Sequence, residues 1–292
     1  MANQSKFISN NEPNKLLSPK KDIVFQVLFG EIGSENITKE FLEAILKERI
    51  TKINLDKNPI LRSLKPTGKK GILDVLVEIN GNEKCNIEMQ VGKRDDIVQR
   101  ILYYWSRTFI RDLDSGEEYS KLQRTIVILI ADFEMSGLEK LEYFSNWKLI
   151  ETKGRKTILT DLIEIDIIEL PKIYKLKEPD MNSKLLDWIC FLENPNSEAV
   201  NKIMESNKGI KAAREKLEDL SNDVIMQRLV EWQESAEHDE ASLKLTARNE
   251  GKQEGIKSEK FEIAKKMKAK GMDVNIIIEL TGLTKEEIEN LN

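Results

Sequence analysis

The chain has 292 residues, of which 40% are hydrophobic and 33% charged, and its formal net charge is −5. This length can bury a full-sized core and leaves room for one large domain or two ordinary ones. We expect a cytoplasmic protein without a membrane partner, because no apolar run could span a bilayer and the polar N-terminus holds no signal core. The net negative charge gives the chain no overall attraction to nucleic acid, so phosphate binding requires a local basic patch.

Cysteine and histidine are too scarce to support several common kinds of site. Cys85 and Cys190 lie far apart in sequence without a CxxC pattern or a histidine companion. We therefore expect neither a disulfide framework nor a zinc site. The single histidine, His238, lies in an acidic stretch typical of solvated surface. The sequence therefore gives little support to a catalytic mechanism that pairs a serine or cysteine nucleophile with histidine.

Hydrophobic spacing predicts a mixed α/β region that follows a disordered leader over residues 1–14. In chain order the predicted elements are helices over 19–30 and 38–49, strands over 53–55, 71–79 and 84–91, a helix over 95–112, and strands over 125–131, 147–150 and 162–170. The β-branched run at 125–131 predicts a buried strand. Turn-forming residues separate the strands, as expected for hairpins.

Beyond Pro179 the composition changes to Glu, Lys, Leu and Met at helical spacing. We therefore predict an α/β domain over residues 15–180 and an all-helical C-terminal region over residues 181–292. The glycine pair Gly251 and Gly255 is expected to interrupt a long polar helix within it.

Residues 257–292 predict three short helical segments, the last capped by Thr284 in capping-box spacing with Glu287. The arrangement looks like a helix-turn-helix. The third helix also carries Glu286 and Glu289, however, and these carboxylates would repel DNA. We therefore favour a module for helical packing or self-association, which predicts a homo-oligomer.

The most informative segment is the predicted hairpin over residues 71–93. If residues 80–82 form a three-residue loop, Ile79 pairs with Glu83, and counting back places Asp74 opposite Glu88. Opposed carboxylates destabilise a sheet, so a fold that keeps them close implies a cation between them, and oxygen ligands suit Mg²⁺ or Mn²⁺. An ordinary amphipathic hairpin with a polar outer face has the same pattern, and the pattern alone leaves both interpretations open.

Several strings in this half of the chain resemble the Rpn family of recombination-promoting nucleases and transposases, within the PD-(D/E)XK superfamily. They are KDIVFQVLFG at 21–30, LDVLVE at 73–78, NIEMQ at 86–90, QRILYYWSRTF at 99–109 and GEEY at 116–119. Together they cover roughly residues 18–135. The resemblance implies a restriction-endonuclease-like core, with a mixed β-sheet flanked by helices, ahead of the helical C-terminal region.

The resemblance also implies roles for residues of the hairpin. Asp74 and Glu88 would bind the metal, with the backbone carbonyl of Met89 as a further ligand. Gln90 occupies the position of the superfamily's catalytic lysine; a glutamine can hydrogen-bond to the attacking water but adds no positive charge. Asp22 matches an acidic position of the family's N-terminal motif and could reach the metal or its water. Its alternative role is that of a helix-start carboxylate on the positive end of the dipole.

The helix after the hairpin offers contacts to DNA. Gln99 and Tyr103 resemble the Q-x-x-x-Y motif of RecB-like nucleases; alternatively, Tyr103 packs in the core and Gln99 is merely solvated. Basic side chains outnumber acidic ones along this segment, which predicts a phosphate-binding face or, as the alternative, a solvated helix face. The predicted DNA contacts are Lys93, Arg94, Gln99, Arg100, Tyr103 and Arg107.

These features predict a divalent-metal-dependent DNA endonuclease that hydrolyses phosphodiester bonds and is linked to DNA recombination or mobile elements. The replacement of lysine by Gln90 keeps a rival open, in which a degenerate nuclease fold binds DNA or a protein without cutting. A structural interaction protein built on the helical C-terminus is the second rival.

Overall fold

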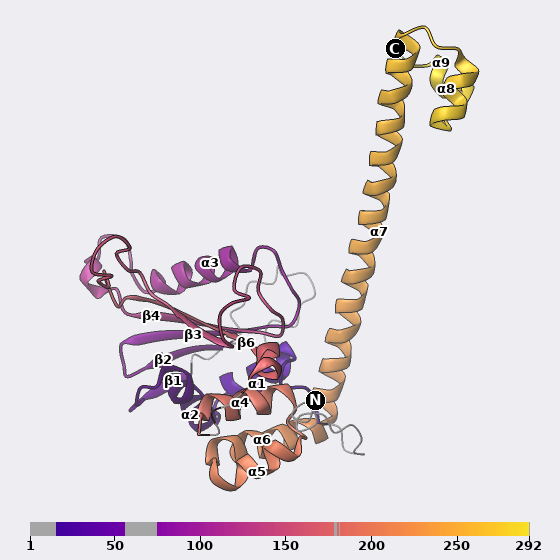
Figure 1. Cartoon of the computed structure of the whole chain (residues 1–292). Helices are drawn as coiled ribbons and strands as arrows, with labels where there is room; N and C mark the ends of the chain where they lie inside the picture. The colour runs from indigo at the N-terminus through magenta and orange to yellow at the C-terminus, as the bar shows by residue number, and fades with distance from the viewer. Residues whose placement is uncertain (1–15, 56–74, 178–179, 181, 292) are drawn as a thin grey trace. The chain divides into compact units, whose positions relative to one another are not determined.

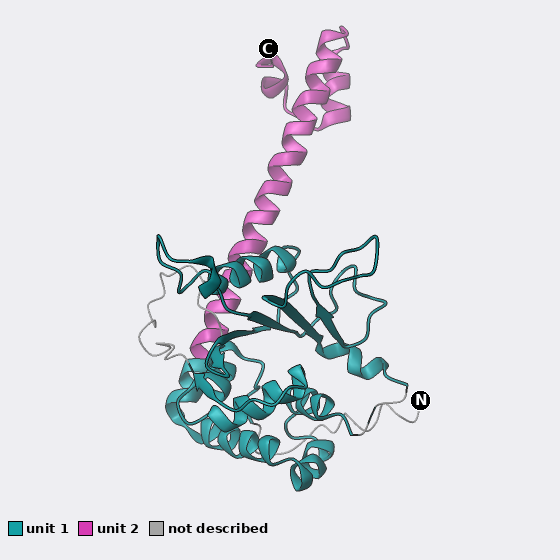
Figure 2. Cartoon of the chain, turned by 90° about the vertical axis from the view of Figure 1, so that its left-hand side faces the viewer, with its two compact units in different colours: residues 1–230 teal, residues 231–292 magenta. Residues whose placement is uncertain are grey.

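The computed structural model describes residues 16–55, 75–177, 180 and 182–291. The predicted leader over residues 1–14 lies outside the described residues. By its internal contacts the chain forms two compact units, residues 1–230 and residues 231–292 (Figure 2).

The first unit contains a six-stranded sheet of order β1-β2-β3-β4-β6-β5 (Figure 1). Strands β1 to β3 are antiparallel, β3, β4 and β6 are parallel, and β5 is antiparallel to β6, so the predicted mixed sheet is confirmed. The strands are β1 (Ile53–Leu55), β2 (Val75–Ile79), β3 (Glu83–Gln90), β4 (Thr125–Ala131), β5 (Phe144–Trp147) and β6 (Ile163–Glu169).

Helices flank the sheet. Up to β4, helices and strands follow one another along the chain in the predicted order. The helices are α1 (Asp22–Gly30), α2 (Glu35–Leu46), α3 (Ile97–Phe109), the 3-10 turns η3 (Tyr119–Lys121) and η4 (Leu170–Lys175), α4 (Lys184–Glu193), α5 (Glu198–Ser206) and α6 (Lys208–Asn222). Helix α3 covers one face of the sheet, and α1, α2 and α4 lie on the other (Figure 1).

Because successive side chains of a strand point to opposite faces, β4 contributes to both layers. Its residues Ile126, Ile128 and Ile130 belong to the main core, with the apolar faces of α1, α2 and α4. Its residues Val127 and Leu129 belong instead to the smaller core beneath α3. This double burial explains why the run at 125–131 is apolar throughout.

The predicted hairpin register is confirmed, since Ile79 pairs with Glu83. The turn takes the required left-handed conformation at Asn80 (φ 55°) and Gly81 (φ 81°), which are residue types that tolerate it. Asp74 itself lies outside the described residues.

The helices that follow residue 180 begin inside the first unit. Trp188 of α4 is 1% exposed, and its ring centroid lies 5.1 Å from that of Phe41 and 6.0 Å from that of Phe29. The sequence boundary at residue 180 therefore separates strand-containing from all-helical sequence within one compact unit, and the units themselves divide at residues 230 and 231.

The second unit holds most of α7 (Val224–Ala269), with α8 (Val274–Thr281) and α9 (Lys285–Glu289). Ala264, Ile277, Leu283 and Ile288 form its small core. The predicted capping box at the start of α9 is present. The expected interruption of α7 at its two glycines is wrong, because the helix is continuous through both. Among the described helices, none is long and apolar enough to cross a membrane.

Candidate functional site

Glu88 lies on the face of β3 that points toward α3. Alternate residues of a strand share a face, so β3 presents a polar row beneath this helix. The row consists of Lys84, Asn86, Glu88 and Gln90. Only 2% of Glu88 is exposed. This face of the hairpin is therefore not an open, solvated surface at Glu88, because α3 covers that side of the sheet.

Asn86 orients the carboxylate of Glu88 from within the same strand. Its side-chain Nδ2 donates to Glu88 Oε1 at 3.0 Å, and Asn86 itself is fully buried. Among the described residues, the Oδ1 atom of Asn86 has no hydrogen-bond partner. A buried amide that holds a buried carboxylate fixes the geometry of that carboxylate, and this is a typical arrangement behind a ligand or catalytic group.

Lys84 shows how β3 aligns with α3. Its Nζ lies 2.7 Å from Asp112 Oδ2 and 3.4 Å from the carbonyl of Thr108, so this end of β3 lies below the C-terminus of α3. Glu88 is four residues further along, or about 13 Å. That distance corresponds to about nine helical residues. Counted back along α3 from Phe109, this estimate puts Glu88 near the level of Arg100.

Arg100 and Tyr104 of α3 are less exposed than the predicted pair Gln99 and Tyr103. The Arg100 guanidinium lies 4.8 Å from the centroid of the Tyr104 ring, and Tyr104 is 3% exposed. The predicted pair Gln99 and Tyr103 instead faces outward, with Tyr103 55% exposed, so packing of Tyr103 in the core is ruled out. The apolar spacing from Ile97 through Tyr104 would have indicated which side of the helix meets the sheet.

The predicted basic contacts lie on the surface around α3. Lys93 and Arg94 are exposed in the connection before the helix, where Arg94 Nε donates to Asp96 Oδ1 at 3.0 Å. This hydrogen bond lowers the pKa of Asp96. Arg107 is exposed, and its guanidinium lies 5.8 Å from the centroid of the Tyr103 ring. Their contacts with DNA stay predictions.

Two other predicted site residues occupy different surroundings. Asp22 is the first residue of α1, a helix that packs on the sheet face opposite to Glu88. The structure thus gives it the position of a helix-start carboxylate. The carbonyl of Gln90 accepts from the backbone N–H of Asp132, the residue that directly follows β4. Because successive carbonyls alternate in direction, that of Met89 points the other way, toward the side of β2.

The described residues contain no group of three or more His, Cys, Asp or Glu side chains that could hold a metal ion. Asp74 is not among the described residues. Its predicted position opposite Glu88 therefore remains a prediction.

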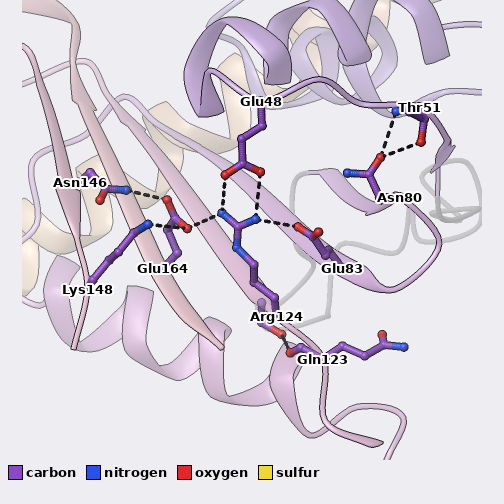
Figure 3. Close-up of polar contacts among 10 residues, drawn as sticks. Glu48, Thr51, Asn80, Glu83, Gln123, Arg124, Asn146, Lys148 and Glu164 are labelled. Carbon is purple, nitrogen blue, oxygen red and sulfur yellow. Dashed lines mark hydrogen bonds and ion pairs between the residues drawn. The ribbon is translucent and has the colours of Figure 1, made fainter. Parts of the chain in front are cut away.

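A charged cluster that the sequence did not reveal lies at the other end of the sheet (Figure 3). Arg124 donates to both carboxylate oxygens of Glu48 at 3.0 and 3.2 Å, to Glu83 at 2.9 Å and to Glu164 at 2.6 Å. Burial alone would raise the pKa of Glu164, but hydrogen bonds from Arg124 and Asn146 lower it. This cluster joins the segment after α2 to β3, to β6 and to the residue before β4, and we assign it a structural role.

The comparison with protein families decides the classification. The model of the PD-(D/E)XK nuclease family transposases matches residues 19–247. The chain belongs to this family. A second model, the C-terminal HTH domain of the Rpn/YhgA-like nuclease family, matches residues 257–292 of this PD-(D/E)XK protein. The searches of curated proteins and of solved structures found no match to the chain.

The helix-turn-helix of this PD-(D/E)XK protein therefore comprises the end of α7 with α8 and α9, and the match favours DNA contact over the packing role inferred from its acidic residues. Glu287 accepts from the backbone N–H of Thr284 at 2.9 Å and lies 3.5 Å from Lys257. Glu289 lies 3.7 Å from Lys285. These contacts offset part of the negative charge of α9. Self-association through the helical C-terminal region stays a prediction.

Proposed function

We propose that the chain is a divalent-metal-dependent DNA endonuclease that hydrolyses phosphodiester bonds in DNA recombination or at mobile elements. The observation that carries the proposal is the β2–β3 register. Its last described pair is Val75 with Ile87. If it continued by one residue, this register would set Asp74 opposite the buried carboxylate of Glu88, on the sheet face toward α3.

The donor set at this position fits Mg²⁺ or Mn²⁺. Asp74 and Glu88 would contribute carboxylate oxygens, and Met89 would contribute the carbonyl on the β2 side of the strand. A buried carboxylate such as Glu88 is costly unless hydrogen bonds and a cation accompany it, and Asn86 supplies one such hydrogen bond. The bound ion would supply charge stabilisation and an activated water.

The remaining residues of the site would position the substrate. Gln90 is half-buried beside Glu88, where its amide can hydrogen-bond to the water or to a phosphate oxygen. We assign to Arg100, at the level of Glu88, the positive charge that Gln90 lacks. The exposed side chains Lys93, Arg94 and Arg107 would contact the DNA backbone, together with Gln99 and Tyr103.

The glutamine at position 90 also favours a second candidate function. A nuclease fold that lacks the motif's lysine could bind DNA or a protein without cutting it. Incubation of the purified chain with supercoiled and linear DNA, with Mg²⁺ or Mn²⁺ and with excess EDTA, separates the two. We expect cleavage with either ion and none with EDTA. Tight DNA binding without any cleavage at saturating metal would support the binding module instead.

A further inference from the structure

A β-ribbon beyond β5 and β6 presents a basic tip that the catalytic site does not use. The backbone N–H of Leu159 donates to the carbonyl of Leu149 at 3.0 Å, and that of Glu151 donates to the carbonyl of Thr157 at 2.9 Å. Between these bonds Ile150 bridges to Ile158. The cross-strand aliphatic pairs stiffen the ribbon as it leaves the sheet.

The tip carries an excess of positive charge within a chain whose net charge is −5. Lys153, Arg155 and Lys156 are all exposed, and within the described part of the chain none of them forms an ion pair. The single carboxylate here, Glu151, faces the loop itself and accepts from the backbone N–H groups of Lys153 and Gly154. The described residues therefore supply no carboxylate that neutralises these three cations.

Lys156 stands in the left-handed region, with φ 54°. Glycine or asparagine would adopt this conformation at lower cost. The geometry of the turn alone does not account for a lysine at position 156, whereas a function for its positive charge does.

We infer that this tip, residues 151–157, binds the phosphate backbone of duplex DNA. Three fixed cations complement phosphates, and a two-stranded ribbon fits the width of the major groove. A duplex is favoured over a single strand because the tip has no aromatic side chain on which unpaired bases could stack.

The ribbon is separate from the proposed catalytic residues. Glu88 is level with Ile167 across the sheet, whereas the ribbon begins beyond Ile163, four residues or about 13 Å away along β6. The inference deepens the proposed function, because it names a second place where the same substrate is held. Substitutions at the tip leave the catalytic residues untouched.

The test measures binding of a fluorescent 20-base-pair duplex to the full chain without metal, over a range of salt concentrations. The variant combines Lys153→Ala, Arg155→Ala and Lys156→Ala. The control combines Lys202→Ala, Lys208→Ala and Lys211→Ala, three exposed lysines of α5 and α6, and so makes the same change in net charge.

We expect the tip variant to bind on the order of a hundredfold more weakly at about 0.1 M salt, with a salt slope smaller by roughly 2.7. The control should change affinity less than threefold. Equal DNA affinities and salt slopes for the two variants would overturn the inference. A tip variant that changes only the oligomeric state in light scattering would also overturn it, because the tip would then bind a second copy of this chain and not DNA. If the parent cleaves DNA and the tip variant binds DNA as tightly as the parent, the inference about the tip is wrong and the proposed nuclease function stands. A parent that binds through the tip but never cleaves would overturn the nuclease function alone.

Discussion

Replacement of Asp166 by asparagine should remove much of the loss of stability that this fold undergoes as the pH rises from about 4 to about 7. Asp166 lies in the middle of β6 and is 1% exposed. Its Oδ1 accepts from Asn146 Nδ2 at 2.7 Å, while among the described residues its Oδ2 has no hydrogen-bond partner. Burial, with repulsion from Glu164, raises the pKa of Asp166 to about 7, against the weaker lowering effect of Asn146.

The size of the effect follows from the difference between the folded pKa of about 7 and the ordinary value of 3.8. Between these values the native chain binds a proton that the unfolded chain has released, so stability falls as the pH rises through this window. Above pH 7 the full cost is present, and the difference corresponds to about 4 kcal/mol. Relaxation around a buried charge lowers such costs, so we expect about 2 to 4 kcal/mol.

The test compares the free energies of unfolding of the parent and of Asp166→Asn at pH 5 and pH 8. Both proteins are unfolded in urea and followed by tryptophan fluorescence. The variant should be more stable at pH 8 by about 2 to 4 kcal/mol and closer to the parent at pH 5, because an amide resembles a protonated carboxyl. Asp161→Asn, an exposed change just before the same strand, serves as the control. Parallel pH profiles for the parent and Asp166→Asn would refute the reasoning.

Three further predictions concern other parts of the chain. Arg124→Met should destabilise the fold by about 3 kcal/mol in urea unfolding, because it leaves three carboxylates close together; an unchanged midpoint would contradict the structural role. Gln90→Ala should lower turnover roughly a hundredfold with little change in metal affinity, and Gln90→Lys should keep or raise it; equal rates for all three proteins would remove Gln90 from the mechanism. A chain ending at residue 256, before the helix-turn-helix match, should keep its fold and metal binding in calorimetry; loss of metal binding by the folded fragment would show that the C-terminal segment completes the site. A cut at Pro179 is unsuitable for this purpose, since it would remove core residues such as Trp188.

Much of the fold could be predicted because local patterns and tertiary packing agree. Alternation and the turn over residues 80–82 set the β2–β3 register, and the apolar run at 125–131 indicated a central strand, as observed. The placement of α4 to α6 could not be predicted, since helical spacing shows that a face is apolar without showing which surface covers it. Trp188 meets residues almost 150 positions earlier in the chain.

The site could be predicted only as far as the strand pattern reaches. Period two places Glu88 and Gln90 on one face, but whether that face is solvated depends on α3, and the structure shows it buried. The same limit applies to α3, where the pair Arg100 and Tyr104 is less exposed than Gln99 and Tyr103. The Arg124 cluster joins segments with no shared sequence pattern, so it could not be foreseen.

Cleavage and metal binding, measured together for single carboxylate variants, test the central claim most directly. Asp74→Asn and Glu88→Gln each remove one proposed metal ligand while keeping its shape. Glu78→Gln, a half-buried residue of β2 in the same hairpin, is the matched control. We predict that both ligand variants remain folded, lose Mn²⁺ binding in calorimetry and cut plasmid DNA at least a hundredfold more slowly, whereas the control matches the parent. Parental rates and metal affinity in both ligand variants would show that Asp74 and Glu88 do not form the catalytic site.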